Sequence, residues 1–341
     1  MVASKNKELT SVSGEPTLSF EQVAGELIRS LRGRQSQAAF SRRIGYRSNI
    51  VSRWEAQQAF PTASRFLEVF AKVRPRETAP LRRFFPRLPV GLAQLELSSR
   101  QAVAAFLTEL KGRTPILSVA RESGFNRYSV SHWLSGDTEP RLPQFLCLVE
   151  VLSRRLLDFL ACCTDPQRMS SVSAAWKRLG LMREAAYTMP WSHAVLRALE
   201  LEQSAEPQLA WLLDRLGISE QVLTEALSVL ERTGQVTKVR GRWSPTRIMS
   251  VNTAQDRTRA HALKVSWTQT ALERMRANAP GNYGYSIFSI SKADLTRMRD
   301  VHLEYVRAMQ QIIAESTAGQ CVGLYCAQLL DLGLSHNALS D

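Results

Sequence analysis

The 341-residue sequence predicts a mostly α fold, in which two tandem helix-turn-helix bundles precede an α+β region with a winged helix. Three observations support this prediction. Apolar residues recur at helical spacing around a glycine in residues 33–61, and the same pattern returns 79 residues later. Residues 207–246 then show two helical patterns followed by a β-hairpin pattern. A chain of this length has room for two or three domains, each with its own core.

Residues 33–61 hold two short helical patterns that meet at Gly45. We expect Ser36 to cap the first helix, which runs to Ile44, and Gly45 to supply the sharp turn, because glycine tolerates a left-handed backbone. The second helix is expected over Arg47–Ala56, with Trp54 facing inward. Its outer face is suited to a DNA major groove. The residues expected on that face are Arg47, Ser48, Asn49, Ser52 and Arg53.

This stretch resembles the lambda-repressor-like (XRE) helix-turn-helix family. The matching residues are Ser36, Gln37, Phe40, Ser41, Ile44, Gly45, Val51, Ser52, Arg53, Glu55 and Pro61. The resemblance implies a small DNA-binding helical bundle in which Gln37 meets the phosphate backbone, where we also expect Arg42. It further implies that Glu55 pairs with an arginine of the first helix of the module, either Arg29 or Arg32.

The charge of the chain favours a polyanionic partner. The sequence has 44 Lys and Arg against 31 Asp and Glu, a net charge of +13, which suits nucleic acid or an acidic membrane surface. Residues 17–98 contain 14 basic and 6 acidic residues, a net charge of +8, so most of the excess lies on the helix-turn-helix part. We therefore expect double-stranded DNA as the partner.

No apolar run is long enough to cross a bilayer, and the N-terminus lacks the apolar centre of a signal peptide. The five cysteines have no metal-ligand spacing and fit a reducing compartment. We therefore expect no membrane partner and a cytoplasmic, nucleoid-associated location.

The internal repeat predicts a second module at residues 95–165. A shift of 79 residues aligns eleven identical residues between positions 31 and 67 and positions 110 and 146, where about two or three would arise by chance from ordinary composition. The identities include the turn glycines Gly45 and Gly124 and the tryptophans Trp54 and Trp133. The outer face expected for the second module consists of Asn126, Arg127, Tyr128, Ser131 and His132.

The two modules differ at positions that the family uses. Ile116 stands where the first module has Gln37, and Leu134 stands where it has Glu55. The second outer face is also less basic. Two interpretations stay open: the second module reads DNA as well, or it has a structural or dimerising role.

The expected domain order is a disordered leader (1–16), the first module (17–74), a basic Pro-rich linker (75–94), the second module (95–165) and a C-terminal regulatory or dimerisation region (166–341). The linker is either a solvated connection or a basic arm that touches phosphates. Phe84 and Phe85 indicate that part of it packs on a neighbouring domain.

The C-terminal region begins with helical spacing over residues 174–201, broken at Pro190. In the winged helix expected over 207–246, the presumed reading helix, Glu220–Thr233, carries acids that repel phosphate. Basic residues lie on the wing: Lys238, Arg240 and Arg242. We expect this unit to act in protein interaction or as a scaffold rather than on DNA.

The rest of the region is expected to form a helix around Val265–Ala277, a strand at Tyr283–Ser289, a long helix at Ser291–Glu315 and a buried strand at Cys321–Ala327. The apolar stripe of the long helix is either a dimer seam or packs on its own sheet. This order of elements resembles the C-terminal region of a poorly characterised bacterial family of helix-turn-helix proteins, known mainly as a domain of unknown function. The resemblance implies a regulator and supplies no chemistry.

No catalytic constellation stands out: the sequence shows no glycine-rich phosphate loop, no nucleophile elbow and no His–x–x–x–His pair. We expect no enzyme activity, no cofactor and no metal site. The leading hypothesis is a sequence-specific DNA-binding transcriptional regulator, more a repressor than an activator. One alternative is a regulator whose C-terminal half binds a peptide, protein or small-molecule effector while DNA binding is secondary. Another is an enzyme that acts on nucleic acid.

One small helix-turn-helix contacts too few bases to find a site in a genome. We therefore expect a homodimer, with a monomer that uses both modules in tandem as the alternative. On this view an inverted repeat in the DNA favours the dimer, and a direct or asymmetric site favours the monomer.

Overall fold

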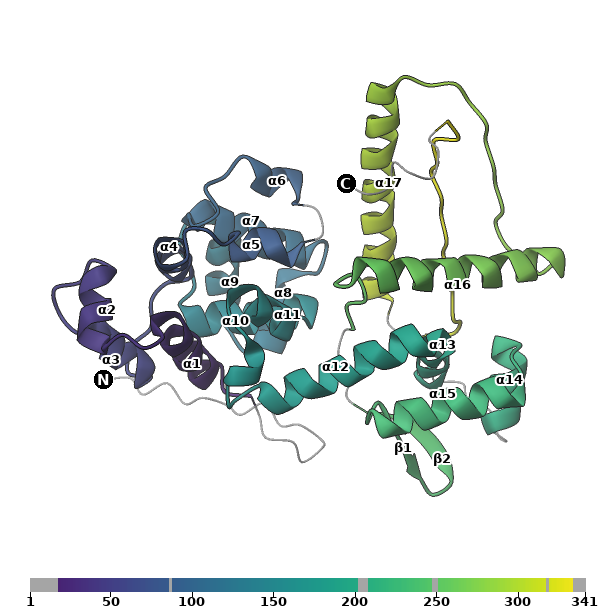
Figure 1. Cartoon of the computed structure of the whole chain (residues 1–341), viewed down its shortest axis with the longest axis horizontal. Coiled ribbons are helices and arrows are strands. Elements are labelled where there is room, and N and C mark those ends of the chain that lie inside the picture. The colour runs from purple at the N-terminus through teal and green to yellow at the C-terminus, as the bar shows by residue number, and fades with distance from the viewer. Residues whose placement is uncertain (1–17, 86–87, 202–207, 247–250, 317–318, 334–341) are drawn as a thin grey trace. The chain divides into compact units, whose positions relative to one another are not determined.

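The computed structural model describes residues 18–85, 88–201, 208–246, 251–316 and 319–333 (Figure 1). The leader expected over 1–16 lies outside these ranges. The described chain is mostly helical and contains one small antiparallel sheet of two strands, which confirms the mostly α prediction. It forms two compact units, residues 1–181 with 249–252 and residues 182–248 with 253–341. The boundary therefore falls inside a helix, later than the expected division at residue 165.

The first unit is helical throughout its described part. Its elements are α1 (Phe20–Arg32), α2 (Gln37–Arg43), α3 (Ile50–Glu55), α4 (Ala63–Val73), α5 (Pro80–Phe84), α6 (Val90–Ala93), α7 (Arg100–Lys111), α8 (Ile116–Ser123), α9 (Arg127–Ser135), α10 (Leu142–Ser153), α11 (Leu156–Cys163), a short 3-10 helix (Pro166–Arg168) and the beginning of α12 (Ser173–Thr188). Helix α1 also holds the segment after the 3-10 helix, since the Glu26 carboxylate accepts hydrogen bonds from Ser170 Oγ (2.6 Å) and Ser171 N (3.1 Å).

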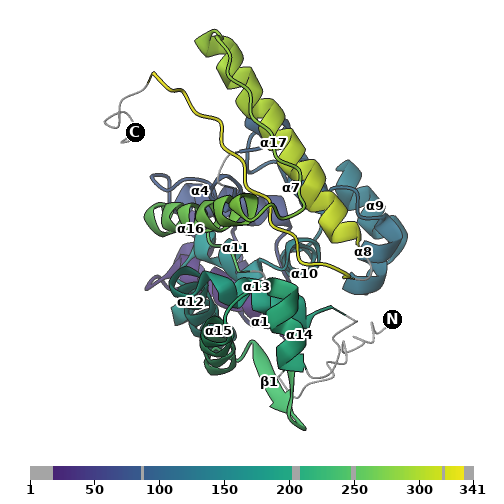
Figure 2. The ribbon, with the colours of Figure 1, turned by 90° about the vertical axis from the view of Figure 1, so that its right-hand side faces the viewer.

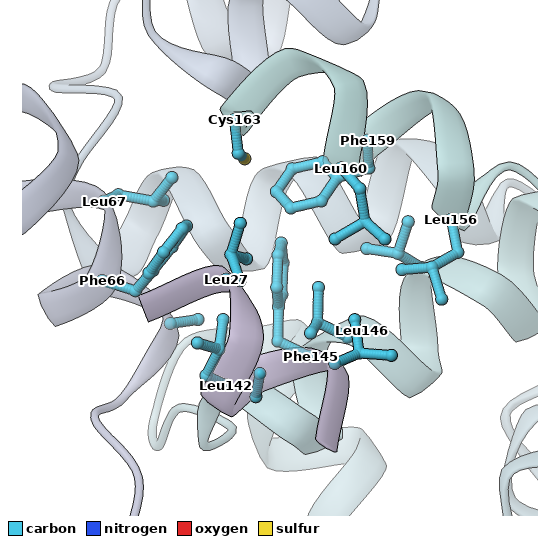
Figure 3. Close-up of a cluster of buried hydrophobic side chains, with 14 of the residues drawn as sticks. Leu27, Phe66, Leu67, Leu142, Phe145, Leu146, Leu156, Phe159, Leu160 and Cys163 are labelled. Atoms are coloured by element: carbon cyan, nitrogen blue, oxygen red, sulfur yellow. The ribbon is translucent and has the colours of Figure 1, made fainter. Parts of the chain in front are cut away.

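The two modules share one hydrophobic core. Buried side chains from Val23 to Leu179 form a continuous cluster, and Figure 3 shows Leu27 of α1 and Phe66 of α4 beside Leu142 and Phe145 of α10. From the length of the chain we expect a separate core for each domain, and the two modules depart from this expectation. Each copy contributes only a few short helices, which bury too little apolar area to be stable alone, so the copies pool their apolar faces.

The Pro-rich segment 75–94 is part of this core rather than a solvated linker. It forms α5 and α6 and buries Leu81, Phe84 and Leu92. The centroid of the Phe84 ring lies 5.4 Å from that of the Phe106 ring of α7. The guanidinium of Arg155 lies 4.3 Å from the centroid of the Phe84 ring. The prolines stop long helices here, but short turns between them still present apolar side chains to the core.

In the second unit, helices α13 (Pro190–Leu199), α14 (Gln208–Leu216) and α15 (Glu220–Arg232) and a β-hairpin pack around a core of their own. The end of α12 precedes these helices, and they are followed by β1 (Val236–Val239), β2 (Arg242–Pro245), α16 (Arg257–Arg276) and α17 (Lys292–Glu315). Helices α13, α14 and α15 pack against one another (Figure 2). The break predicted at Pro190 is confirmed, since α12 ends at Thr188 and Pro190 opens α13.

The β-hairpin predicted at the end of residues 207–246 is confirmed, and Arg240 and Gly241 form its turn. Both residues have positive φ angles, +51° and +83°, as a two-residue hairpin turn requires. The side-chain amide of Gln208 on α14 pairs with the backbone of Trp243 on β2, with N–O distances of 2.9 and 2.8 Å. This contact fixes the hairpin against the helices of the same unit.

Two predicted strands are wrong. Residues 283–289 and 321–327 are extended but belong to no sheet, and most of their side chains are exposed. Each segment has strand-forming composition, but a strand also needs a partner in the ladder, and the described chain supplies none. Helix α17 begins after Ser291, as predicted, and Asp294 N donates to Ser291 Oγ at 3.0 Å. Its apolar stripe stays largely uncovered, with Val301, Tyr305 and Ile312 all more than half exposed.

Helix α16 begins at Arg257, eight residues before the start that the sequence predicted, because Asp256 caps it by accepting from Arg259 N. Within the described ranges, no helix has both the length and the hydropathy needed to cross a membrane.

Candidate nucleic-acid interface

The segment from α2 to α3 contains a sharp turn, as the sequence predicts. Ser36 caps α2 by accepting from Ala39 N at 3.2 Å, and Gly45 follows the helix with φ of +96°. Residues other than glycine rarely adopt this φ angle. Helices α2 and α3 lie side by side at the edge of the first unit (Figure 1).

Helix α3 is shorter than predicted. It begins at Ile50 rather than Arg47, because Asn49 is its N-cap and accepts from Ser52 N at 3.4 Å. An asparagine side chain offers the backbone this alternative to a further helical turn. Arg47 and Ser48 therefore lie in the turn, Asn49 lies at the cap, and only Ser52 and Arg53 lie on α3 itself.

Buried Ser41 connects the two helices. Its hydroxyl donates to the carbonyl of Gln37 (2.8 Å) and lies 3.2 Å from the Asn49 side-chain oxygen, and it accepts from Val51 N at 3.2 Å. The turn is also held by Arg65 of α4, which donates to the carbonyl of Ile44 at 2.6 Å. Sequence reasoning missed both roles. For Ser41 a signal existed, since it is a small polar residue on the buried side of a helix, but nothing in the pattern indicated Arg65.

Glu55 is the buried polar centre of the first module. Its side chain is 3% exposed. Nε of Arg32 donates to it at 2.6 Å and Nε2 of Gln37 at 2.8 Å, while Nε of Arg29 lies 3.6 Å away. Burial alone would raise the pKa of Glu55, but the hydrogen bonds from Arg32 and Gln37 and the charges of Arg32 and Arg29 together lower it. The pairing of Glu55 with an arginine of the first helix is thus confirmed.

Gln37 is not free in this structure. The residue expected at the phosphate backbone is half-buried, and its amide nitrogen is engaged with Glu55. A phosphate contact would have to use the second N–H of the same amide, because an amide NH₂ group has two donors.

The exposed surface around the start of α3 is basic. Within the described part of the chain, no carboxylate pairs with four arginines of this surface, and all four are exposed: Arg42, Arg43, Arg47 and Arg53. Arg43 joins the residues expected there. We refer to Arg42, Arg43, Arg47, Ser48, Asn49, Ser52 and Arg53 as the first outer face. Arginines without acidic partners retain their hydrogen-bond donors for another molecule.

The second module presents its expected residues on the outside as well. Asn126 caps α9 by accepting from Tyr128 N at 2.8 Å, and the Tyr128 side chain is 76% exposed. Arg127, Ser131 and His132 are also exposed. His132 is within 3.1 Å of the Asp137 carboxylate, which leaves this side less cationic than the first outer face. We refer to Asn126, Arg127, Tyr128, Ser131 and His132 as the second outer face.

Comparison of the chain with models of known protein families gives one match. Residues 171–328 match the model of a domain of unknown function, DUF4423. The DUF4423 match covers less than half of the chain, starts just before α12 and includes α13 to α17. It lies in the half whose sequence pattern resembles such a domain, and it assigns no chemistry. No curated protein matches the chain, and no solved structure does.

The DUF4423 match leaves both outer faces outside it, since they belong to residues 42–53 and 126–132. Among the described residues, no group of three His, Cys, Asp or Glu side chains is placed to hold a metal ion.

Proposed function

We propose that the chain is a sequence-specific double-stranded-DNA-binding transcriptional regulator. In this proposal α2, the Gly45 turn and α3 form a lambda-repressor-like helix-turn-helix, and the first outer face enters the major groove. The observation that carries the proposal is the set of exposed arginines around the start of α3 that have no carboxylate partner among the residues that the structure describes. A neutral structural surface would have no reason to concentrate unpaired charge there.

The chemistry of the face suits base recognition. Arg47 and Arg53 can each donate two parallel hydrogen bonds to a guanine edge, and each good pair of this kind discriminates by about 1–3 kcal/mol. The oxygen of Asn49 caps α3, but its NH₂ group remains available to the N7 acceptor of a purine. Arg42 and Arg43, at the end of α2, are suited to phosphates, which give affinity and register rather than sequence.

Binding at a promoter would repress more simply than it would activate, because a protein that occupies the promoter excludes polymerase without further contacts. A regulator of this kind acts at the nucleoid in the cytoplasm. Two reading elements are needed on each site, and they come either from two chains in a homodimer or from the two modules of one chain.

We further propose that α13, α14, α15 and the β1–β2 hairpin form a winged helix that contacts protein rather than DNA. The exposed side of α15 carries Glu220, Gln221 and Glu225, and carboxylates at this position would repel phosphate. Lys238 of the hairpin lies 5.3 Å from the centroid of the Trp243 ring, so this wing cation is partly engaged within its own strand pair.

A second candidate function is a regulator whose C-terminal half does the main work by binding a peptide, protein or small-molecule effector. The observation that favours it is the uncovered apolar surface of the second unit, which includes Val301 and Ile312 on α17. Exposed apolar surface of this kind often marks an interaction site. DNA binding would then be secondary and weakly selective.

The test compares the full-length wild type with the R47A/N49A variant. Gel-shift titrations use two probes of equal length. One is DNA that the wild type recovers from a library of genomic fragments, and the other is random DNA. We expect affinity for the recovered sequence to fall about 100-fold, since two base contacts are lost, and affinity for random DNA to fall much less. The control R299A removes one exposed charge from α17 and should leave discrimination intact. Equal losses on both probes, or no loss, would reject sequence reading by this face.

A further inference from the structure

The two modules meet at residues that are equivalent in the repeat. Thr62 and Arg141, which are 79 positions apart, form an antiparallel bridge. Ala63 N donates to the carbonyl of Pro140 at 3.0 Å, and Leu142 N donates to the carbonyl of Pro61 at 2.9 Å. Adding 79 to position 63 gives 142, and subtracting 79 from position 140 gives 61, so the exchange of equivalent positions turns the first bond into the second. Exchanging the modules therefore maps the bridge onto itself, which is the property of a local two-fold axis.

The helices beside the bridge follow the same exchange. Helix α4 starts at Ala63 and its equivalent α10 starts at Leu142, and the two contact each other. Helix α1 packs against α10, and its equivalent α7 packs against α4. The core shows the same relation, since Figure 3 places Phe66 near its equivalent Phe145, in a cluster that also contains Leu67 and its equivalent Leu146.

The second module keeps the internal contacts of the first. Tyr46 and Trp54 meet edge to face at 5.5 Å and 86°, and their equivalents Phe125 and Trp133 do so at 5.3 Å and 84°. In the first module the ring pair holds the segment before α3 against α3, and in the second module it holds the segment before α9 against α9. A module that had lost its local geometry would not retain this pair.

The turn after the first helix is also kept. Arg32 donates to the carbonyls of Gly33 and Gln35, and its equivalent Lys111 donates to the carbonyls of Gly112 and Thr114 at 2.8 and 3.0 Å. The polar pair Gln37 and Glu55 is replaced as a pair, by Ile116 and Leu134, which are partly buried against the core. The second module therefore has the same scaffold, with the apolar side chains of Ile116 and Leu134 in place of the polar pair. Its main remaining difference from the first module is its outer face.

A two-fold arrangement has a direct meaning for DNA. The strands of a duplex run antiparallel, so a protein pair related by a two-fold axis reads half-sites in inverted orientation. In homodimers the half-sites are alike because the subunits are alike. Here the two outer faces differ, since one is rich in arginine and the other contains exposed Tyr128 and His132.

We propose that one chain binds one DNA site with both modules, and that this site consists of two unlike half-sites in inverted orientation. The inference rests on the proposed function. From the sequence we expect an inverted repeat in the DNA to indicate a homodimer. If one chain binds with both modules, inverted half-sites are also the site of a monomer. The chain behaves as an internal pseudo-dimer, and because its site is asymmetric it binds in a single direction along the DNA.

The test is selection of bound sequences from a random DNA library by full-length wild type, by R47A/N49A and by R127A/Y128A. Sedimentation of each complex with its selected duplex gives the number of chains. We expect the wild type to form a complex of one chain and one duplex and to select two unlike inverted half-sites. R127A/Y128A should lose preference in one half-site and bind the full site about tenfold more weakly, while R47A/N49A should lose preference in the other.

The outcomes separate this inference from the proposed function. Two chains on two alike half-sites, or an R127A/Y128A selection identical to that of the wild type, would overturn the internal pseudo-dimer and leave DNA reading by the first module intact. A wild type without any sequence preference would overturn both. All four substituted side chains are exposed, but Asn49 also caps α3, so R47A alone, which keeps the cap, is selected in parallel with R47A/N49A. Thermal unfolding of R47A and of R127A/Y128A should match the wild type, and the comparison then does not depend on a damaged fold.

Discussion

The Glu55 carboxylate accepts a 2.6 Å hydrogen bond from Nε of Arg32, and this pair ties the end of α3 to the end of α1. The carboxylate is 3% exposed and the arginine side chain 17%. A buried carboxylate that loses its counterion keeps the cost of desolvation without the compensating attraction. The stability of the first module therefore depends on this contact.

We expect R32A to lower the free energy of unfolding by about 3 kcal/mol, because it leaves Glu55 buried with Gln37 as its principal remaining partner. The matched control is R34A, which removes an exposed arginine two positions further on and should change stability by less than about 0.5 kcal/mol. Urea unfolding followed by tryptophan fluorescence measures both. Equal effects of the two variants would contradict the role assigned to the pair.

The second module suggests how the first tolerates loss of Glu55. E55L alone should be destabilising, since it leaves the amide of Gln37 facing an apolar side chain. Q37I/E55L reproduces Ile116 and Leu134 and should recover at least about 1 kcal/mol of that loss, as expected for coupled neighbours. A double-mutant cycle on unfolding free energies measures the coupling. Additive effects would show that the two positions do not act as a unit.

Stability should fall in acid partly through Glu55. Its pKa is lower in the folded chain than its ordinary value of 4.5, so the unfolded state binds more protons near that pH. The stabilisation is therefore complete above about pH 5 and is lost as the pH falls through the folded pKa. We expect E55Q to be less stable than wild type at pH 7, and the difference to shrink toward pH 3.

Glu26 provides the control for this pH dependence. Burial raises its pKa, but hydrogen bonds from Ser170, Ser171 and Gln22 lower it overall. Its hydrogen-bond partners differ from those of Glu55, so E26Q should remove a separate part of the acid sensitivity. Urea titrations between pH 3 and 7 measure both variants. A difference between E55Q and wild type that stays constant across this range would contradict the depressed pKa.

The Pro-rich segment should contribute to stability through Phe84. This ring is 3% exposed and lies among the Phe85, Phe106 and Phe159 rings, so F84A should cost about 3–5 kcal/mol. V90A, at an 80% exposed position of α6 in the same segment, is the control and should cost less than about 0.5 kcal/mol. Thermal unfolding followed by circular dichroism gives both values. A mild effect of F84A would restore the linker interpretation.

Several features of the fold were predictable because they depend on a few neighbouring residues. The turn at Gly45, the cap at Ser36, the start of the long helix at Ser291 and the hairpin within residues 207–246 all appear where the sequence places them. Start and end signals of this kind act through hydrogen bonds within about four residues, so the local sequence contains them. The exposure of Arg53, Ser131 and His132 follows from the helical periodicity of α3 and α9.

Other features depend on contacts between separate elements. The start of α3 at Ile50 is one of them, since the Asn49 side chain that caps α3 also contacts Ser41 of the neighbouring helix α2. The predicted strands at 283–289 and 321–327 did not form, because strand composition does not supply a ladder partner. The inclusion of Phe84 in the core depends on ring contacts with Phe106 of α7 and Phe159 of α11.

The sequence by itself determined that this chain contains two copies of one helical pattern, a basic first copy and a hairpin after a pair of helices. These properties reside in composition, spacing and short-range hydrogen bonding. Only the tertiary structure decided that the copies share one core and pair at Thr62 and Arg141. The reason is that a repeat specifies the same local structure twice, whereas the orientation of the copies is set by apolar burial and backbone pairing between segments 79 residues apart.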